Sequence, residues 1–237
     1  LGSNVVNISL ILGLALLISG IKNSRDFTRR DLPVAVIIPL LTGMLFLDGV
    51  LSRIDGVLLL CLFIAWCLAT VYEARRQRSF TLAAPVGQKK WIIYISCVVG
   101  MGLLIVAGNL IVTGARDIAI SFGINEFIIG ATIVAIGTST PELATTIMAK
   151  LQGHDEIGVG TILGSNIFNG TFIIAIAAII CPITVPWRDV AVTLIFGLIS
   201  LAFVFPPHNG FLERRRGGFL LVLYVAYITT ILQSSAK

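Results

Sequence analysis

The sequence predicts an all-α, polytopic integral membrane protein, and three observations lead to that fold class. Of its 237 residues, 57% are hydrophobic and 12% are charged, whereas a soluble domain carries about 25% charged residues. The mean hydropathy is +0.98. Apolar stretches that match the roughly 20 residues needed to cross a bilayer recur along the whole chain. A net charge of +5 therefore indicates basic connections between membrane helices, and does not indicate a nucleic-acid-binding surface.

About eight membrane helices are predicted, separated by short polar connections. They cover residues 1–21, 32–50, 55–74, 91–114, 125–149, 157–181, 188–206 and 217–234. The helices end where charge appears, at Lys22 to Arg30, Arg53 and Asp55, Arg75 to Lys90, Arg116 and Asp117, Lys150 to Glu156, Arg188 and Asp189, and Glu213 to Arg216. Acidic residues at these ends, Asp155 among them, are expected to be solvated. The longest connection, 75–90, is too short to form a domain.

Lysine and arginine are unevenly divided between alternate connections, and this division predicts the orientation. Thirteen of the 17 basic residues fall on the side that includes connection 75–90. Basic connections stay in the cytoplasm. The sequence therefore predicts a multi-pass protein of the plasma (inner) membrane, with 75–90 in the cytoplasm and Lys237 outside.

The sequence of the first residues is repeated later in the chain, in a segment that is predicted to cross the membrane in the opposite direction. Residues 1–15 and 163–177 are identical at seven positions, beginning with Leu-Gly-Ser-Asn in both. By the charge division, the first copy enters the cytoplasm and the second leaves it, as in inverted-repeat transporters. We therefore predict the end of a first repeat over 1–74 (three helices), a short loop over 75–90 and a second repeat over 91–237 (five helices).

One polar segment, Gly137 to Leu143, interrupts the predicted helix 125–149. It places Glu142, two hydroxyl side chains and Pro141 among apolar residues. A charge inside a bilayer is costly and marks a functional site. Proline lacks an N–H and clashes with the preceding turn, so the carbonyls of Ala135 to Gly137 are expected to lack partners and to be open to a cation. The first copy should follow a similar segment, so an N-terminal part is expected to precede Leu1.

Hydroxyl, amide and carboxylate side chains recur at helical spacing in both copies. They form the pairs Thr138 and Glu142, Ser139 and Glu142, Ser165 and Asn169, and Ser3 and Asn7. Residues three or four apart share a helix face. Such an all-oxygen set suits Ca²⁺ or Na⁺ rather than a soft metal. Taken singly, Ser3, Thr138 and Ser139 are equally well explained by hydrogen bonds between membrane helices.

These motifs resemble the calcium/cation antiporter superfamily, most closely its prokaryotic sodium/calcium exchanger-like branch. Gly137 to Leu143, followed by Gly158 to Asn169, is similar to the family's second alpha repeat, and Leu1 to Ser9 is similar to the tail of the first. The family has ten helices in an inverted-repeat antiporter fold, so the resemblance implies that this chain holds helices three to ten. The glutamate of the first repeat is not in this sequence.

The resemblance also implies a set of cation ligands. Glu142 would be the principal acidic ligand for Ca²⁺ and Na⁺. The other implied ligands are Thr138, Ser139, the carbonyl of Ala135, Asn169, Ser165, Asn7 and Ser3. Some exchangers carry aspartate where this chain has Asn169, and an amide cannot titrate, so the coupling ion stays open.

The expected function is exchange of Ca²⁺ for Na⁺ by alternating access, without a cofactor. Two alternatives stay open: a Ca²⁺/H⁺ exchanger in which Glu142 takes the proton, and a non-transporting half that needs a partner. An enzyme is not expected, since no Ser/His or His/Glu pair is predicted at membrane depth; His154 and His208 fall in connections.

Overall fold

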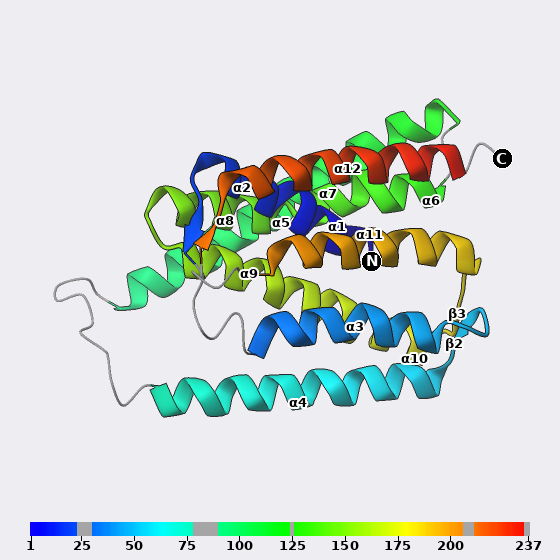
Figure 1. Cartoon of the computed structure of the whole chain (residues 1–237), viewed down its shortest axis with the longest axis horizontal. Coiled ribbons are helices and arrows are strands. Elements are labelled where there is room, and N and C mark those ends of the chain that lie inside the picture. Colours follow the sequence, from blue (N-terminus) through cyan, green and yellow to red (C-terminus); the bar gives the residue numbers. More distant parts are fainter. Residues whose placement is uncertain (23–29, 78–89, 124–125, 206–210, 235–237) are drawn as a thin grey trace.

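The computed structural model describes residues 1–22, 30–77, 90–123, 126–205 and 211–234. Within these ranges the chain forms a bundle of long helices (Figure 1). The helical bounds are α1 Gly2–Val5, η1 Val6–Leu12, α2 Gly13–Ile18, α3 Leu32–Leu45, α4 Arg53–Gln77, α5 Lys90–Ser121, α6 Glu126–Ile129, η3 Gly130–Val134, α7 Ala135–Thr138, α8 Thr140–Leu151, α9 Asp155–Phe168, η4 Asn169–Ile173, α10 Ile174–Ile180, α11 Trp187–Val204 and α12 Arg214–Ser234.

The all-α, polytopic fold class is confirmed. Segments that follow one another without a break, such as α1, η1 and α2, form single helices, and each predicted membrane helix has a counterpart. Within the described residues, four helices are long and apolar enough to cross a membrane: Arg53–Arg76, Trp91–Ser121, Asp155–Ile180 and Arg214–Gln233. Their neighbours Gly2–Ile18, Leu32–Leu45 and Val190–Val204 are apolar but shorter.

The predicted helix 125–149 is divided at Ser139. This residue has φ −93° and ψ 4°, and α8 begins directly after it with Pro141 in its first turn. Proline fits a first turn, where its missing N–H is not needed. The interruption expected from the sequence therefore takes the form of two helices, α7 and α8, that meet end to end.

Two short sheets join segments that are far apart in the sequence. At one end of the bundle, β1 (Ile21–Lys22) pairs with β4 (Phe211–Leu212). At the other end, β2 (Val50–Leu51) pairs with β3 (Ile183–Thr184). The order helix, strand, helix, strand, helix over 2–77 recurs over 155–234. The two opening helices, 2–18 and 155–180, run in opposite directions (Figure 1). The elements thus correspond in the inverted sense.

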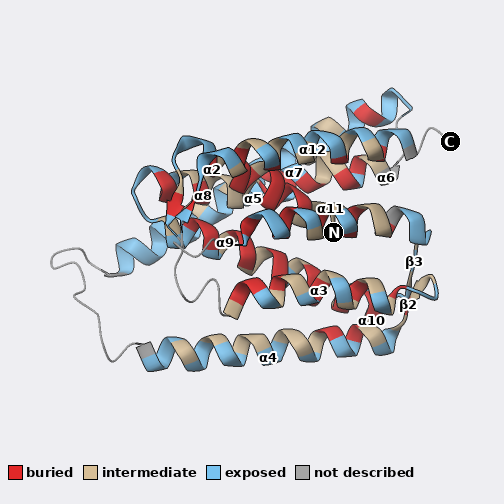
Figure 2. Cartoon of the chain, viewed as in Figure 1, coloured by how far each residue is buried: buried red, intermediate tan, exposed pale blue. Residues whose placement is uncertain are grey.

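The core lies around helix 2–18, whereas α4 and α5 expose apolar side chains over most of their length (Figure 2). Leu12, Ala15 and Leu16 are fully buried. On α5, by contrast, Val98 is 72% exposed and Leu110 is 68% exposed. Apolar side chains exposed along a whole helix are suited to contact with lipid tails.

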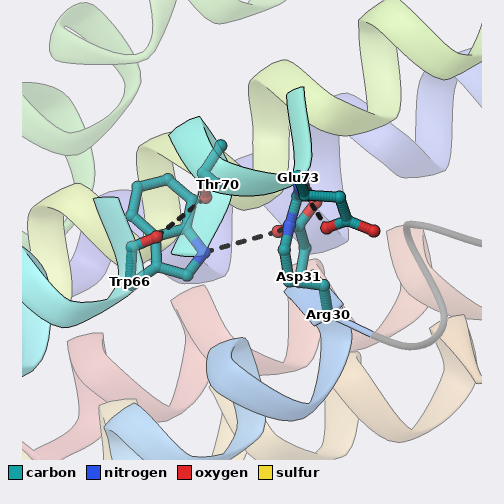
Figure 3. Close-up of polar contacts among 5 residues, drawn as sticks. All are labelled: Arg30, Asp31, Trp66, Thr70 and Glu73. Carbon is teal, nitrogen blue, oxygen red and sulfur yellow. Dashed lines mark hydrogen bonds and ion pairs between the residues drawn. The ribbon is translucent and has the colours of Figure 1, made fainter. Parts of the chain in front are cut away.

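A cluster of charged side chains fastens the start of α3 to the end of α4 (Figure 3). The Arg30 guanidinium donates two hydrogen bonds to Asp31, at 2.7 and 2.9 Å, and one to Glu73 at 2.9 Å. The indole N–H of Trp66 also donates to Asp31, at 3.4 Å. These contacts raise the pKa of the Arg30 guanidinium, the hydrogen bond to Asp31 being the largest cause. The arginine therefore remains charged at this end of the bundle.

A second ion pair corrects the expectation that Asp155 is a solvated residue. Lys150 has a side chain only 4% exposed, and its ammonium group lies 2.8 Å from an Asp155 oxygen. It also donates to the carbonyl of Gly20 at 2.7 Å. The other Asp155 oxygen accepts the backbone N–H of Lys22 at 3.2 Å. Asp155 therefore links the start of α9 to β1 and, through Lys150, to the end of α8.

Candidate cation site

Glu142 lies in the first turn of α8 and contacts the helix that contains Ser165. The Ser165 hydroxyl donates to Glu142 Oε1 at 2.6 Å. The second carboxylate oxygen, Oε2, is buried and has no hydrogen-bond partner in the described structure. A carboxylate in the first turn is favoured by the dipole of α8. Glu142 is thus held by one oxygen, and the other is available to a cation.

The hydroxyls next to the helix break differ in their contacts. Thr138 Oγ1 lies 3.1 Å from Ser3 Oγ on α1, so the residue before the helix break touches the first copy of the repeated pattern. Thr138 also donates to the carbonyl of Val134 at 2.9 Å. Ser139 is only 1% exposed, and its hydroxyl has no partner among the described residues. A buried hydroxyl without a partner is costly, which makes Ser139 a second available oxygen.

Asparagines join the opening helices of the two copies. Asn7 is fully buried, and its Nδ2 donates to Asn166 Oδ1 at 2.9 Å. Asn169 Nδ2 donates to Ser165 Oγ at a long 3.5 Å. The predicted residues Asn7, Ser3, Asn169, Ser165, Thr138 and Glu142 therefore lie on helices in direct contact.

Three π-helical stretches accompany these residues. Asn7 lies in η1, Asn169 begins η4, and η3 directly precedes α7. Inserting an extra residue into a turn produces such stretches, which occur frequently at functional sites. The stretches in η1 and η4 occupy corresponding positions of the two copies. The local distortion thus recurs where the asparagines recur.

The carbonyl of Ala135 corrects one expectation. It accepts the backbone N–H of Ser139 at 3.2 Å and the Thr138 hydroxyl at 3.3 Å. A carbonyl oxygen has two lone pairs, so the Ala135 carbonyl is not short of partners. Because the helix breaks at Ser139, after Gly137, the last turn of α7 still closes on Ala135.

Two features next to the proposed ligands were missed in the sequence analysis. Asn4 and Asn166 were left out of the candidate set, although both belong to the repeated Leu-Gly-Ser-Asn pattern, and both hydrogen-bond across the two copies. The second missed feature is Gly108 of α5. A Cβ at Gly108 would lie 2.7 Å from the carbonyl oxygen of Gly137, so glycine allows α5 to approach the helix break closely.

The available oxygens define the chemistry of the site. Asn7 Oδ1, Ser139 Oγ and Glu142 Oε2 are buried and unpaired within the described part of the chain. Carboxylate, amide and hydroxyl oxygens are ligands that hard cations prefer. Glu142 brings the only negative charge among the eight predicted ligands. These oxygens are therefore of the chemical kind that Na⁺ and Ca²⁺ bind.

Comparison with known proteins decides the family. The family described as "Sodium/calcium exchanger protein" matches residues 1–72 and 92–233. The chain belongs to the sodium/calcium exchanger family. It is 36% identical to Inner membrane protein YrbG of Escherichia coli strain K12 and 32% identical to the Putative antiporter CaxA of Alkalimonas amylolytica. Each match covers 96% of this chain and 75% of the relative.

A solved member of this family has the same fold. The sodium-calcium exchanger NCX_Mj, soaked with 2.5 mM Na⁺ and 0.1 mM Ca²⁺, matches with a TM-score of 0.76 and 28% sequence identity. The match covers 97% of this chain and 74% of NCX_Mj. The resemblance seen in the sequence is therefore confirmed, and the chain is a multi-pass membrane protein of a cation-antiporter family.

Proposed function

We propose that this chain exchanges Ca²⁺ for Na⁺ across the membrane, with the described oxygen cluster as its ion site. The single observation that carries the proposal is the unpaired, buried Oε2 of Glu142, in a chain of the sodium/calcium exchanger family. The proposed ligands are Glu142, Thr138, Ser139, the carbonyl of Ala135, Asn169, Ser165, Asn7 and Ser3. Because the Ala135 carbonyl already accepts two hydrogen bonds, it would have to exchange one of them for the ion.

Sodium, rather than a proton, is the proposed coupling ion. NCX_Mj and MaX1 of Methanosarcina acetivorans, which is 36% identical over 116 residues, are named as sodium/calcium exchangers. Asn169, whose amide cannot take up a proton, leaves Glu142 as the only titratable side chain among the proposed ligands. Neutral oxygens beside one carboxylate provide a ready coordination shell for Na⁺.

Exchange follows from the cost of moving a bare charge. An empty site would carry the Glu142 carboxylate through a dry path, which is unfavourable. Binding of either cation removes much of that cost, so the site reorients when it is loaded. Since both cations use the same oxygens, one leaves before the other binds, and the two fluxes are coupled.

We also propose the division of the chain into 1–74, a connection over 75–90, and 91–237. The support is the matching order of helices and strands in 2–77 and 155–234. Most of the connection, residues 78–89, lies outside the described residues.

The coupling ion is tested in proteoliposomes that contain the purified protein. An outward Na⁺ gradient should drive uptake of radioactive calcium, and a pH gradient of equal size without Na⁺ should not, because Na⁺ binds the same oxygens as Ca²⁺. Choline in place of Na⁺ is the matched control. Uptake driven by the pH gradient alone would establish the proton-coupled alternative instead.

The orientation is tested with two exposed residues at opposite ends of α4. In a variant without the four native cysteines, Arg53→Cys should react with a membrane-impermeant thiol reagent in intact cells, whereas Arg76→Cys should react only after lysis. The expectation rests on the thirteen basic residues assigned to the cytoplasmic side. The reverse labelling pattern would invert the proposed topology.

A further inference from the structure

Asn4 and Asn166 form a reciprocal pair of hydrogen bonds between the opening helices of the two copies. Asn4 Nδ2 donates to the backbone carbonyl of Asn166 at 3.1 Å. Asn166 Nδ2 donates to the backbone carbonyl of Asn4 at 3.1 Å. The two asparagines occupy the same position of the repeated Leu-Gly-Ser-Asn pattern. The contact therefore fastens α1 to α9 symmetrically, one helical turn from Asn7 and Asn169.

Asn166 has a second contact that Asn4 does not share. Its Oδ1 accepts the Nδ2 group of Asn7 at 2.9 Å. Both ends of the Asn166 side chain are thus engaged, which fixes the direction of its amide. The Asn7 amide is fixed in turn, since its Nδ2 points to Asn166 and its Oδ1 is the unpaired, buried end.

The direction of an amide decides whether it can bind a cation. An asparagine offers either a carbonyl oxygen, which accepts a cation, or an NH₂ group, which repels one. We propose that Asn166 is a positioning residue, which turns the Asn7 amide so that its oxygen rather than its nitrogen serves the ion site. The inference rests on the proposed function and extends it to a residue outside the ligand set.

The second copy lacks the corresponding contact. Asn169, the counterpart of Asn7, donates weakly to Ser165 at 3.5 Å. Asn4, the counterpart of Asn166, keeps a buried Oδ1 without a partner in the described structure. The Asn7 oxygen is therefore preorganised and the Asn169 oxygen is not. Loss of the orienting residue should accordingly weaken the site through Asn7.

A double-mutant cycle on calcium affinity tests the inference. Equilibrium binding of radioactive calcium is measured in lipid nanodiscs for Asn166→Ala, Asn7→Ala and the double variant. Partners that orient a metal ligand typically contribute 10–100-fold in affinity, so we expect each single change to weaken binding by about tenfold. The double variant should also lose about tenfold rather than roughly 100-fold, because both changes take the same atom, Asn7 Oδ1, away from the ion.

Two controls separate positioning from a general loss of structure. Asn4→Ala removes one reciprocal bond but leaves the Asn7–Asn166 contact, so it should lower the unfolding temperature and leave calcium affinity within about twofold. Thr171→Val alters a fully buried residue whose hydroxyl, among the described residues, donates to the carbonyl of Ile167 on its own helix, and it should leave affinity unchanged. Should Asn166→Ala fail to give monodisperse protein, Asn166→Ser replaces it and must meet the same requirement.

The outcomes distinguish this inference from the proposed function. The positioning role would be overturned if the double variant lost roughly 100-fold in calcium affinity, or if the Asn166 variant kept the affinity of the unaltered protein. The exchanger proposal would still be supported in either case, provided that the unaltered protein binds calcium and Glu142→Gln does not. Failure of the unaltered protein to bind calcium would remove both.

Discussion

Glu142→Gln should abolish calcium flux while the protein still folds and inserts. Glutamine can keep the hydrogen bond that Ser165 donates at 2.6 Å, so the local packing is retained. The change removes the only negative charge among the proposed ligands. Since even an outer-shell partner typically contributes 10–100-fold in metal affinity, loss of the charged ligand should cost at least roughly 100-fold. Sodium-driven calcium uptake in proteoliposomes and elution as a single species measure the two effects.

The matched control is Glu156→Gln, the same change at an exposed residue of α9. It should transport at the rate of the unaltered protein. Asp155→Asn would be a poor control, because Asp155 pairs with the buried Lys150. Equal flux in Glu142→Gln and the unaltered protein would show that this carboxylate does not bind the transported ion.

Lys150→Met should cause the largest loss of stability among changes away from the ion site. The lysine side chain is 4% exposed, and its removal leaves the Asp155 carboxylate, itself 19% exposed, without its cation. Breaking a buried ion pair on one side costs about 3–5 kcal/mol, and the partial exposure of Asp155 favours the lower end. For a chain of this size, about 3 kcal/mol lowers the unfolding midpoint by roughly 6–12 °C.

Thermal unfolding in detergent measures this effect. Lys22→Met is the control, because the Lys22 side chain is exposed and only its backbone N–H contacts Asp155; its midpoint should stay unchanged. The double variant Lys150→Met/Asp155→Leu should recover part of the loss, since it removes the unpaired charge as well. An unchanged midpoint in Lys150→Met would mean that the ion pair contributes nothing to the fold.

Hydropathy and charge were sufficient to predict the helices but not their local distortions. A membrane helix is recognised from about 20 consecutive apolar residues. A π-helical turn adds a single residue and leaves that apolar pattern intact. The two-residue strands, such as Ile21–Lys22, are likewise too short to carry a pattern of their own. Those strands form by pairing between segments far apart in the sequence.

A candidate residue stood out in the sequence where its chemistry is costly in an apolar segment. Glu142 stood out because a carboxylate beside Pro141 is costly in an apolar segment. Asn166 did not, since an amide in a membrane helix is usually explained by hydrogen bonds between helices, and only the structure shows that both ends of its side chain are used. The Lys150–Asp155 pair was missed because span-end charges normally reach water.

The two short sheets have a consequence for how the polypeptide is held together. Each sheet pairs a strand from the first half with one from the second, at opposite ends of the bundle. In addition, α4 packs against α10 and α12 packs against α2. The two proposed repeats are therefore interlaced rather than placed side by side, and these contacts hold them together in addition to the covalent connection between α4 and α5. If the chain were synthesised as two separate pieces divided between α4 and α5, the pieces could form the same strand pairs and helix contacts with each other.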